Sequence, residues 1–524
     1  MVSRRKLLSS SLILPFSIRG ATSLSSDINS FSNLDLGVAS GDPRQNSVVI
    51  WTRIPQYLTQ GSLRSIEVEF QVAKSPDFSK KSVVKKGRIQ SSWQRDFTVK
   101  TEVDDLEAST IYYYRFIFGE YISVIGRTKT APLRYNIESL RFAIMSCQDY
   151  SSGFYTSYQN LINENLDFCV HLGDYIYEEV TEDNSTIRFD PTGLALSLDQ
   201  YRLKYRYYLS DPYLREARRL FPFIHIWDDH EFLNNYAGAS ATQTSFLRAK
   251  NAAQAFTEYL PVPELEDNDD AIEVDLTRKL NFGPLLDIYA TDSRMHRTSY
   301  PCKPGLGFVC SESNDEKHTM LGAKQKNWLK NSLSDTSARW KLILTSTMFA
   351  PFKLINQKEL IGIASQQLKS LALQTKGFYL NFDAWDGYPQ ERLELTHFLF
   401  SEKIRNVVFC SGDIHSAFTS NIHLDPNNVK SPRVAKEITT SSLSSKNFAD
   451  HSFGLDLEKL GISQLILKAN PHMTFGNFTQ HGYTVFELNE QGCSIDRIAV
   501  VTIKKAFSTS FVLSRDFIPE YSIS

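Results

Sequence analysis

Residues 168–178 read FCVHLGDYIYE, an apolar run that ends in a glycine and is followed at once by acidic and aromatic side chains. Such a run is typical of a strand in a layered α/β domain. Ligands of open α/β sheets bind beyond the carboxyl ends of the strands, so the polar residues here mark a candidate site. We expect them to converge with the polar ends of four similar runs, 140–149 (LRFAIMSCQD), 223–231 (FIHIWDDHE), 285–294 (LLDIYATDSR) and 407–415 (VVFCSGDIH).

Two different patterns divide the chain. Residues 33–132 show short alternating runs, such as 47–51, 66–72 and 111–116, which are separated by turn-rich segments. This rhythm predicts a small antiparallel β-sandwich domain. In residues 133–524, apolar strands alternate with helix-like stretches, which is the pattern of a larger α/β domain.

The charge of the chain is nearly balanced, with 57 Lys and Arg against 59 Asp and Glu among 524 residues. This balance argues against binding through a broad basic surface, and we expect no stable nucleic-acid complex. Six cysteines are too few for a disulfide framework. Cys302 and Cys310 bracket a Pro/Gly-rich loop and predict one local bridge in an oxidising compartment. Cys169 and Cys410 lie in apolar runs and are expected in the core.

The N-terminus has the pattern of a twin-arginine signal peptide over residues 1–26. The pair Arg4-Arg5 precedes an apolar stretch from Leu7 to Ile18, and Ala21-Thr22-Ser23 offers a cleavage site. The twin-arginine export machinery is then a partner, and the protein is periplasmic or extracellular. The alternative is a basic amphipathic N-terminus without a role in export. We expect no transmembrane segment in the mature form, because no later run reaches about 18 apolar residues.

The polar clusters supply oxygen, nitrogen and sulfur donors of the kinds that bind metal ions. Several anionic ligands offset the charge of two or more cations, and a carboxylate is able to bridge them. Phenolate and thiolate suit a highly charged ion such as Fe3+, while oxygen ligands suit Ca2+. Gly173 and Gly412 precede two of the aspartates and let the backbone turn sharply. The candidate donors are Cys147, Asp174, Tyr177, Asp229, His230, Asp413 and His415, with Asn234 and Asn235 nearby.

Each of these signals also has a simpler explanation. Residues 228–231 are compatible with a helix N-terminus that Asp228 or Asp229 caps. Residues 412–415 are compatible with an Asp-stabilised turn that carries a solvated histidine. Cys147 alone is compatible with a buried thiol. The joint placement of the clusters at strand ends favours a single site.

Several motifs follow one another in a recognisable order. They are Gly37–Pro43, Ser146–Gln148, Gly173–Glu178, Trp227–Glu231 with Asn234–Tyr236, Asp292–Arg294, Asp383–Pro389, Ser411–His415 and His481–Tyr483. In this order they resemble the motifs of the PhoD-type alkaline phosphatases and phosphodiesterases. The resemblance implies a metallophosphoesterase-like αββα sandwich, similar to that of purple acid phosphatases, behind the small β-sandwich. It also implies an exported phosphatase with Fe3+ and Ca2+ as cofactors.

Transferred residue by residue, the resemblance implies which side chains would hold the ions. Cys147 and Tyr177 would bind iron, and Asp174 would bridge the cations. Asp413 and His415 would complete the metal shell.

The resemblance also implies roles around calcium and the substrate. The spacing leaves open which of Asp229, Asn234 and Asn235 binds Ca2+, and we expect Asp229 and Asn235. His230 is expected to donate a proton to the leaving oxygen. Arg294 is expected to clamp the phosphate with its forked guanidinium.

The expected reaction is hydrolysis of phosphomonoesters and phosphodiesters by a metal-activated hydroxide, without a covalent enzyme intermediate. One alternative makes Cys147 a covalent nucleophile, but residues 148–153 contain no arginine and add an acid. Another alternative is a secreted binding module with structural metals, whose sandwich contacts a polymer or a cell surface. After Gly482 the residues alternate as in strands, so we expect no helical lid over the site.

Overall fold

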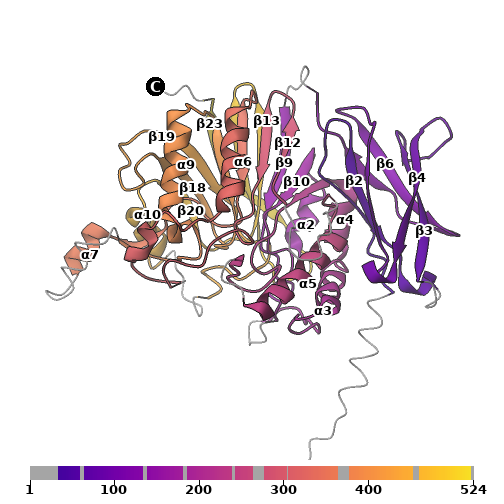
Figure 1. The fold of residues 1–524 in the computed structure, drawn as a ribbon, viewed down its shortest axis with the longest axis horizontal. Coiled ribbons are helices and arrows are strands. Elements are labelled where there is room, and N and C mark those ends of the chain that lie inside the picture. Colours follow the sequence, from indigo (N-terminus) through magenta and orange to yellow (C-terminus); the bar gives the residue numbers. More distant parts are fainter. Residues whose placement is uncertain are drawn as a thin grey trace, which may run out of the picture.

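In the computed structural model, two β-sheets lie face to face between layers of helices (Figure 1). Phe168 stacks on Phe142 of its own sheet, with ring centroids 4.6 Å apart, and on Phe282 of the opposite sheet at 4.4 Å. The inner faces of both sheets therefore share one apolar core. The αββα sandwich expected from the sequence is confirmed.

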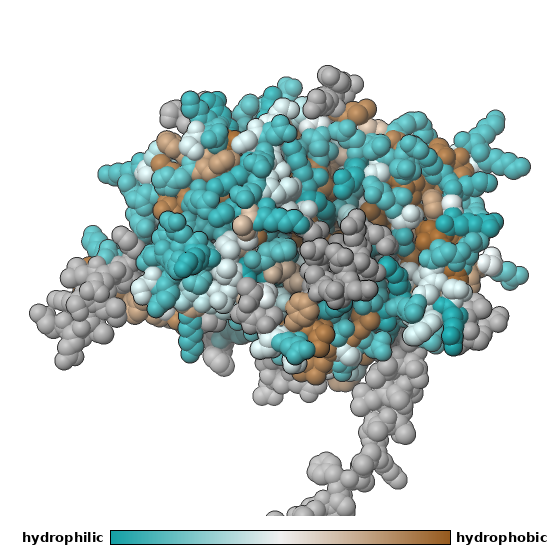
Figure 2. All heavy atoms as spheres, viewed as in Figure 1, coloured by the Kyte–Doolittle hydropathy of each residue, from teal (hydrophilic) through white to brown (hydrophobic). Residues whose placement is uncertain are grey.

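The structure describes residues 33–59, 64–133, 139–180, 186–238, 242–263, 276–303, 305–363, 377–451 and 459–520. The predicted signal peptide at 1–26 lies outside these residues. Within the described ranges, no helix is both long and apolar enough to cross a membrane. On the face seen in Figure 2, hydrophilic residues predominate and hydrophobic residues form small separate groups.

The first sheet has nine strands in the order β23-β22-β21-β9-β10-β11-β1-β2-β5. They are β1 (Val38–Gly41), β2 (Val48–Arg53), β5 (Thr98–Val103), β9 (Ser139–Met145), β10 (Phe168–His171), β11 (Pro222–His225), β21 (Gly482–Asn489), β22 (Gly492–Val500) and β23 (Ser510–Pro519). β9, β10 and β11 are parallel neighbours, so their carboxyl ends meet at one edge. Over residues 482–520 the chain forms strands and no helix, as the alternation predicts.

The second sheet has seven strands in the order β12-β13-β14-β17-β19-β18-β20. They are β12 (Arg278–Phe282), β13 (Leu286–Ala290), β14 (Trp340–Leu344), β17 (Val407–Ser411), β18 (Ala417–His423), β19 (Arg433–Thr439) and β20 (Met473–Asn477). β13, β14, β17 and β19 are parallel. A separate two-stranded sheet pairs β15 (Lys353–Asn356) with β16 (Gly377–Tyr379). The short helix α7 (Gln357–Ile363) follows β15 directly in the sequence.

Helices cover the outer face of each large sheet. The first sheet is covered by α2 (Thr156–Leu161), α3 (Leu198–Tyr208), α4 (Pro212–Leu220) and α5 (Gln243–Tyr259). The second is covered by α6 (Gly322–Ser334), α9 (Pro389–Ser401) and α10 (Ile462–Ala469). Local sequence fixes several helix starts. α3 begins with a capping box between Ser197 and Gln200.

The N-terminal β-sandwich is present, but one of its two layers belongs to the first large sheet. Its outer layer is a five-stranded sheet of β3 (Ser65–Ala73), β4 (Val83–Ser92), β6 (Ile111–Phe118), β7 (Tyr121–Ile122) and β8 (Gly126–Lys129). This layer packs on β1, β2 and β5 through a core that includes Ile50, Val68 and Tyr114. β1 in turn pairs in parallel with β11. The predicted domain boundary between residues 132 and 133 stays a prediction. Backbone hydrogen bonds between β1 and β11 join the parts of the chain before and after it.

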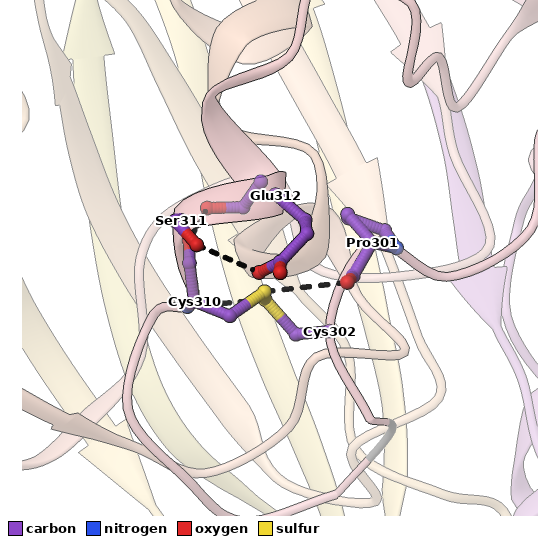
Figure 3. Close-up of a disulfide and its surroundings, with 6 residues drawn as sticks. Pro301, Cys302, Cys310, Ser311 and Glu312 are labelled. Atoms are coloured by element: carbon purple, nitrogen blue, oxygen red, sulfur yellow. Dashed lines mark hydrogen bonds between the residues drawn. A yellow bond between two sulfur atoms is a disulfide. The ribbon is translucent and has the colours of Figure 1, made fainter.

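The predicted disulfide between Cys302 and Cys310 is formed (Figure 3). Cys302 packs against Tyr379 and Phe382, and the backbone N–H of Phe382 donates to the carbonyl of Gly305 at 3.2 Å. The bridged loop thus lies beside the segment that leads into the Asp383 motif. The other described cysteines are free and buried, as expected for those in the strands.

Asp96 joins the N-terminal strands to the helices of the first sheet. Its carboxylate accepts hydrogen bonds from Arg53 of β2 at 2.9 and 3.0 Å, from Arg206 of α3 at 2.6 Å and from Tyr259 of α5. Burial alone would raise the pKa of Asp96, but the guanidinium groups of Arg53 and Arg206 outweigh it and hold the pKa well below its usual range.

We expect Asp96→Asn to lower the free energy of unfolding by about 3–5 kcal/mol at pH 7, because two buried arginines lose their counter-ion. Asparagine tolerates the left-handed backbone at this position, where φ is 49°. The pKa of Asp96 is depressed in the folded state, so its contribution to the free energy of unfolding is fully present above the unfolded-state pKa of about 4. This contribution is lost as the pH falls through the pKa of the folded state. Urea unfolding at pH 7 and at lower pH measures the difference.

The matched control is Asp105→Asn, since Asp105 is also left-handed (φ 52°) but forms an exposed ion pair with Lys85 at 2.9 Å. It should cost less than about 1 kcal/mol. Equal losses for the two variants would contradict the role given to Asp96.

Candidate metal centre

The polar clusters at the strand ends converge, as the sequence predicts. Cys147 follows β9, Asp174 follows β10, Asp228 and Asp229 follow β11, and Asp413 follows β17 of the other sheet. Their donor atoms form three groups, in each of which the atoms lie within 4.8 Å of one another. The groups are Cys147, Asp174 and His415; Asp174, Asp229 and His230; and Asp228, Asp229 and Asp413. Asp174 and Asp229 each belong to two groups, so the three form one continuous cluster.

The backbone at this cluster is unusually constrained. Cys147, Asp174, Asp413 and His415 have φ values of 58°, 55°, 66° and 55°, in the left-handed region that side chains rarely adopt. Such conformations gather at functional sites, where the surrounding structure holds them. Gly173 has φ 108°, and a Cβ there would lie 2.4 Å from the backbone nitrogen of Asp228. The sharp turn predicted for Gly173 is confirmed.

Gly412 is needed for a different reason from the one predicted. It does not have a positive φ, and the left-handed residue at this turn is Asp413 itself. A Cβ at Gly412 would lie 2.5 Å from Oγ of Ser146. The glycine therefore allows the two sheets to approach closely at the site, which a local sequence pattern does not reveal.

Tyr177 contacts two members of the first group, Asp174 and His415. Its hydroxyl donates to Asp174 Oδ2 at 2.8 Å, lies 3.1 Å from His415 Nε2 and accepts from Ser445 Oγ at 2.7 Å. Burial first, and then the Asp174 carboxylate, raises the pKa of both Tyr177 and Cys147 well above its usual value. Both groups are thus protonated without a cation nearby. A cation among them would favour phenolate and thiolate, so this donor set fits a metal ion.

The acidic part of the cluster is crowded with buried carboxylates. Burial and the neighbouring Asp229 and Asp174 raise the pKa of Asp228 to about 8, although Arg294 opposes this. Burial and nearby acids likewise raise the pKa of Asp413. Asp228 Oδ2 and Asp229 Oδ1 are buried and accept no hydrogen bond from any described residue. Oxygens of this kind suit a hard cation such as Ca2+.

Arg294 lies fully buried among these acids. Its Nε donates to Asp228, and its Nη1 donates to Asp383 at 2.6 Å. Its Nη2 lies 3.4 Å from Asp229 and 3.6 Å from Asp413 and has no hydrogen-bond partner among the described residues. Two of its three nitrogens thus hold the carboxylates in place. The role of Arg294 as a phosphate clamp stays a prediction, with Nη2 as the nitrogen left for it.

His230 lies over Tyr177, with ring centroids 4.1 Å apart. Its Nδ1 lies 2.7 Å from Glu178 Oε2, which leaves Nε2 for exchange with a substrate. Burial opposes the charged ring, but Asp174, Glu178 and Asp229 together raise the pKa of His230 well above its usual value. The geometry suits a proton donor, and this role stays a prediction.

The two asparagines differ in their exposure. Asn234 is exposed and gives its backbone N–H to Glu178 at 2.8 Å, whereas Asn235 is partly buried and gives its backbone N–H to Asp229 at 2.5 Å. Asn235 also has a left-handed backbone, with φ 57°. Its place beside Asp229 agrees with the expected Ca2+ site, and its ligand role stays a prediction.

The helix N-terminus considered for residues 228–231 is wrong, because these residues form turns and α5 begins only at Gln243. The sequence interpretation missed the role of Glu231 in these turns. Its carboxylate accepts the backbone N–H groups of Asp174 at 2.9 Å, Tyr175 at 2.5 Å and Asp228 at 2.7 Å. It thereby joins the ends of β10 and β11. A glutamate within an acidic run was the only signal.

Asp383 was also missed as a structural residue, although it stands in a quoted motif. Its carboxylate accepts from Arg294, from Arg297 at 2.7 Å and from Tyr300 at 2.5 Å. It therefore balances the charge of two buried guanidinium groups behind the acidic cluster.

Comparison with known proteins identifies the family. A family model described as PhoD-like phosphatase matches residues 142–496. The chain belongs to the PhoD-like phosphatase family. A second model, for the N-terminal domain of PhoD-like phosphatases, matches residues 21–132. This PhoD-like phosphatase is 33% identical over 455 residues to alkaline phosphatase D of Bacillus subtilis (strain 168). The match covers 84% of this chain and 73% of that protein.

Solved structures agree with this membership. A structure of PhoD is 30% identical and matches with a TM-score of 0.82 over 94% of this chain and 90% of that one. Purple acid phosphatase PPD1 from yellow lupin matches with a TM-score of 0.53 over 88% of this chain and 71% of that one, at 9% identity. The second match shows the fold alone, and it confirms the metallophosphoesterase-like sandwich. This PhoD-like phosphatase is thus a hydrolase of the PhoD type.

We expect Glu231→Gln to lower phosphatase activity by about tenfold or more, because Glu231 holds the backbone of the candidate ligand Asp174 and the loss of such a support weakens a metal site. The amide would place its N–H groups against backbone N–H groups and lower the free energy of unfolding by about 1–3 kcal/mol. Phosphate release and urea unfolding measure the two effects.

Glu391→Gln is the matched control, because Glu391 of α9 likewise accepts two backbone N–H groups, from Met320 and Leu321, at 3.1 Å. It should lose similar stability and keep its activity. If both variants lost activity to the same extent, Glu231 would have no special part in holding the cluster.

Proposed function

We propose that this phosphatase is an exported, metal-dependent enzyme that hydrolyses phosphomonoesters and phosphodiesters. The observation that carries the proposal is the sharing of Asp174 and Asp229 between adjacent donor groups, which suits more than one cation. The phosphate-ester substrate follows from the family, and its two ester classes from the motif resemblance.

Fe3+ and Ca2+ are the proposed ions. The soft and aromatic donors Cys147 and Tyr177, with Asp174 and His415, suit Fe3+, and the oxygen donors of Asp229, Asn235 and Asp413 suit Ca2+. When bound, the cations would supply Lewis-acid activation of water and neutralise charge on the phosphoryl oxygens.

The chain itself would supply the proton and part of the positive charge. His230, held through Nδ1 by Glu178, would give the proton on Nε2 to the leaving oxygen. Arg294 would present Nη2 to the phosphate while its other nitrogens stay on Asp228 and Asp383. Cys147 would not attack the phosphate, because its raised thiol pKa is the opposite of what a nucleophilic thiolate needs.

Export by the twin-arginine route to the periplasm or the extracellular space completes the proposal. Its support is the Arg4-Arg5 pattern in the sequence together with the Cys302–Cys310 disulfide, since such bridges persist in oxidising compartments. The twin-arginine route carries folded proteins, so the ions would be loaded before export.

We expect protein purified through its own export route to contain iron and calcium and to show a visible charge-transfer band. A strong chelator should abolish phosphate release from p-nitrophenyl phosphate and its bis ester, and Fe3+ with Ca2+ should restore it. Elemental analysis, absorption and phosphate release are the measurements. Full activity after complete metal removal would contradict the proposal, as would a metal-replete, folded protein that releases no phosphate.

We expect Asp174→Asn to reduce turnover by at least about a hundredfold while the protein still folds, because a shared anionic donor becomes neutral. Asp287→Asn is the matched control. Asp287 is equally buried but binds Asn281 at 2.6 Å and Lys279 at 2.8 Å, outside the three donor groups. The role of Asp174 would be disproved if both variants kept wild-type turnover.

A further inference from the structure

His481 belongs to a motif that the proposed chemistry does not use. It immediately precedes β21 and is 8% exposed. Its backbone is fixed in the first sheet, because its carbonyl accepts the N–H of Val500 at 2.9 Å and the next residue, Gly482, donates its N–H to Ser442 at 3.1 Å. A buried histidine so placed is well suited to orient a neighbouring loop.

That loop is residues 440–450, which follow β19 and run along the backbone of Cys147. The N–H of Leu443 donates to the carbonyls of Ser146 at 3.0 Å and Cys147 at 3.1 Å, and the N–H groups of Ser444 and Ser445 approach Cys147 at 3.3 Å. The 440–450 loop therefore forms a wall of the first donor group.

Two groups of the 440–450 loop contact expected iron ligands. Ser445 Oγ donates to the Tyr177 oxygen at 2.7 Å. The Lys446 carbonyl lies 2.7 Å from Nδ1 of His415, and a carbonyl only accepts, so Nδ1 carries the proton. His415 Nε2 is then free to face the donor group, 4.0 Å from Asp174 Oδ2. Partners of this kind set the orientation and electron donation of metal ligands.

His481 holds both ends of the 440–450 loop. Its Nδ1 lies 3.0 Å from Ser442 Oγ, and that hydroxyl donates to the Ser445 carbonyl at 2.6 Å. Its Nε2 lies 2.9 Å from Asp450 Oδ2 and 3.2 Å from the side-chain nitrogen of Asn447. The imidazole thus spans the loop just before and just after the two residues that contact the ligands.

We infer that His481, paired with Asp450, is a positioning residue for the metal centre. It keeps the Ser445 hydroxyl on the Tyr177 oxygen and the Lys446 carbonyl on His415. It touches neither substrate nor ligand, and it acts through the 440–450 loop. The inference rests on the proposed function only in assigning iron to Tyr177 and His415.

The test compares His481→Ala with wild type in the full-length, metal-loaded enzyme. Without the hydrogen bond from Ser445, the phenolate donates electrons more readily, so the visible band should move to longer wavelength. Iron retention and kcat should fall about 10- to 100-fold, the usual effect of losing such a partner. His481→Asn retains a polar group towards Ser442 and should recover most of the band position. Asp450→Asn should give a smaller shift in the same direction.

The matched control is His472→Ala. His472 is similarly buried, and its Nε2 donates to the carbonyl of Pro351 at 2.9 Å, away from the 440–450 loop. It should leave the band, the iron content and kcat unchanged. If His472→Ala shifted the band as much as His481→Ala does, His481 would contribute only to general stability. That result would overturn the inference.

Hydrogen exchange followed by mass spectrometry gives a readout without metal. In the metal-free protein, His481→Ala should speed exchange in peptides of the 440–450 loop, whereas His472→Ala should not. Unchanged exchange in this loop overturns the inference. If the wild-type protein binds no iron and shows no band, the iron assignment fails, and the exchange measurement still decides the role of His481.

Discussion

The mutual repulsion of buried carboxylates at the junction of the two sheets is the constraint on which the rest of this structure depends. Asp174, Asp228, Asp229 and Asp413 follow three strands from both sheets, and the guanidinium of Arg294 lies near three of them, Asp228, Asp229 and Asp413. An arrangement of this kind is unfavourable unless protons or cations neutralise part of its charge. The supporting contacts, Glu231 on the backbone and Asp383 behind Arg294, hold the acids together.

Both sheets contribute to the centre in the same physical way. Parallel strands bring their carboxyl ends to one edge, and the chain leaves β9, β10 and β17 through a left-handed residue that carries a donor side chain of the cluster. The strain at Cys147, Asp174 and Asp413 is distributed over separate turns, each secured by backbone hydrogen bonds. Backbone hydrogen bonds thus help to hold the site, together with those of the side chains.

Much of this was readable from sequence, because it depends on local patterns. The apolar runs, the glycine before Asp174, the Cys302–Cys310 bridge and the ordered motifs each lie within a short stretch, and the sandwich, the turn and the bridge are confirmed. What the sequence did not reveal depends on pairs distant along the chain. Examples are the closeness of Gly412 to Ser146, the Arg294–Asp383 pair and the parallel pairing of β1 with β11.

The pairing of β1 with β11 has a consequence for how the protein is dissected. A fragment that starts after residue 132 would lack β1, β2 and β5, and β11 would become an uncovered edge strand of the first sheet. Its free N–H and C=O groups would offer a template for other chains, which promotes aggregation. The N-terminal strands thus protect the catalytic sheet, and they cannot be treated as a detachable appendage.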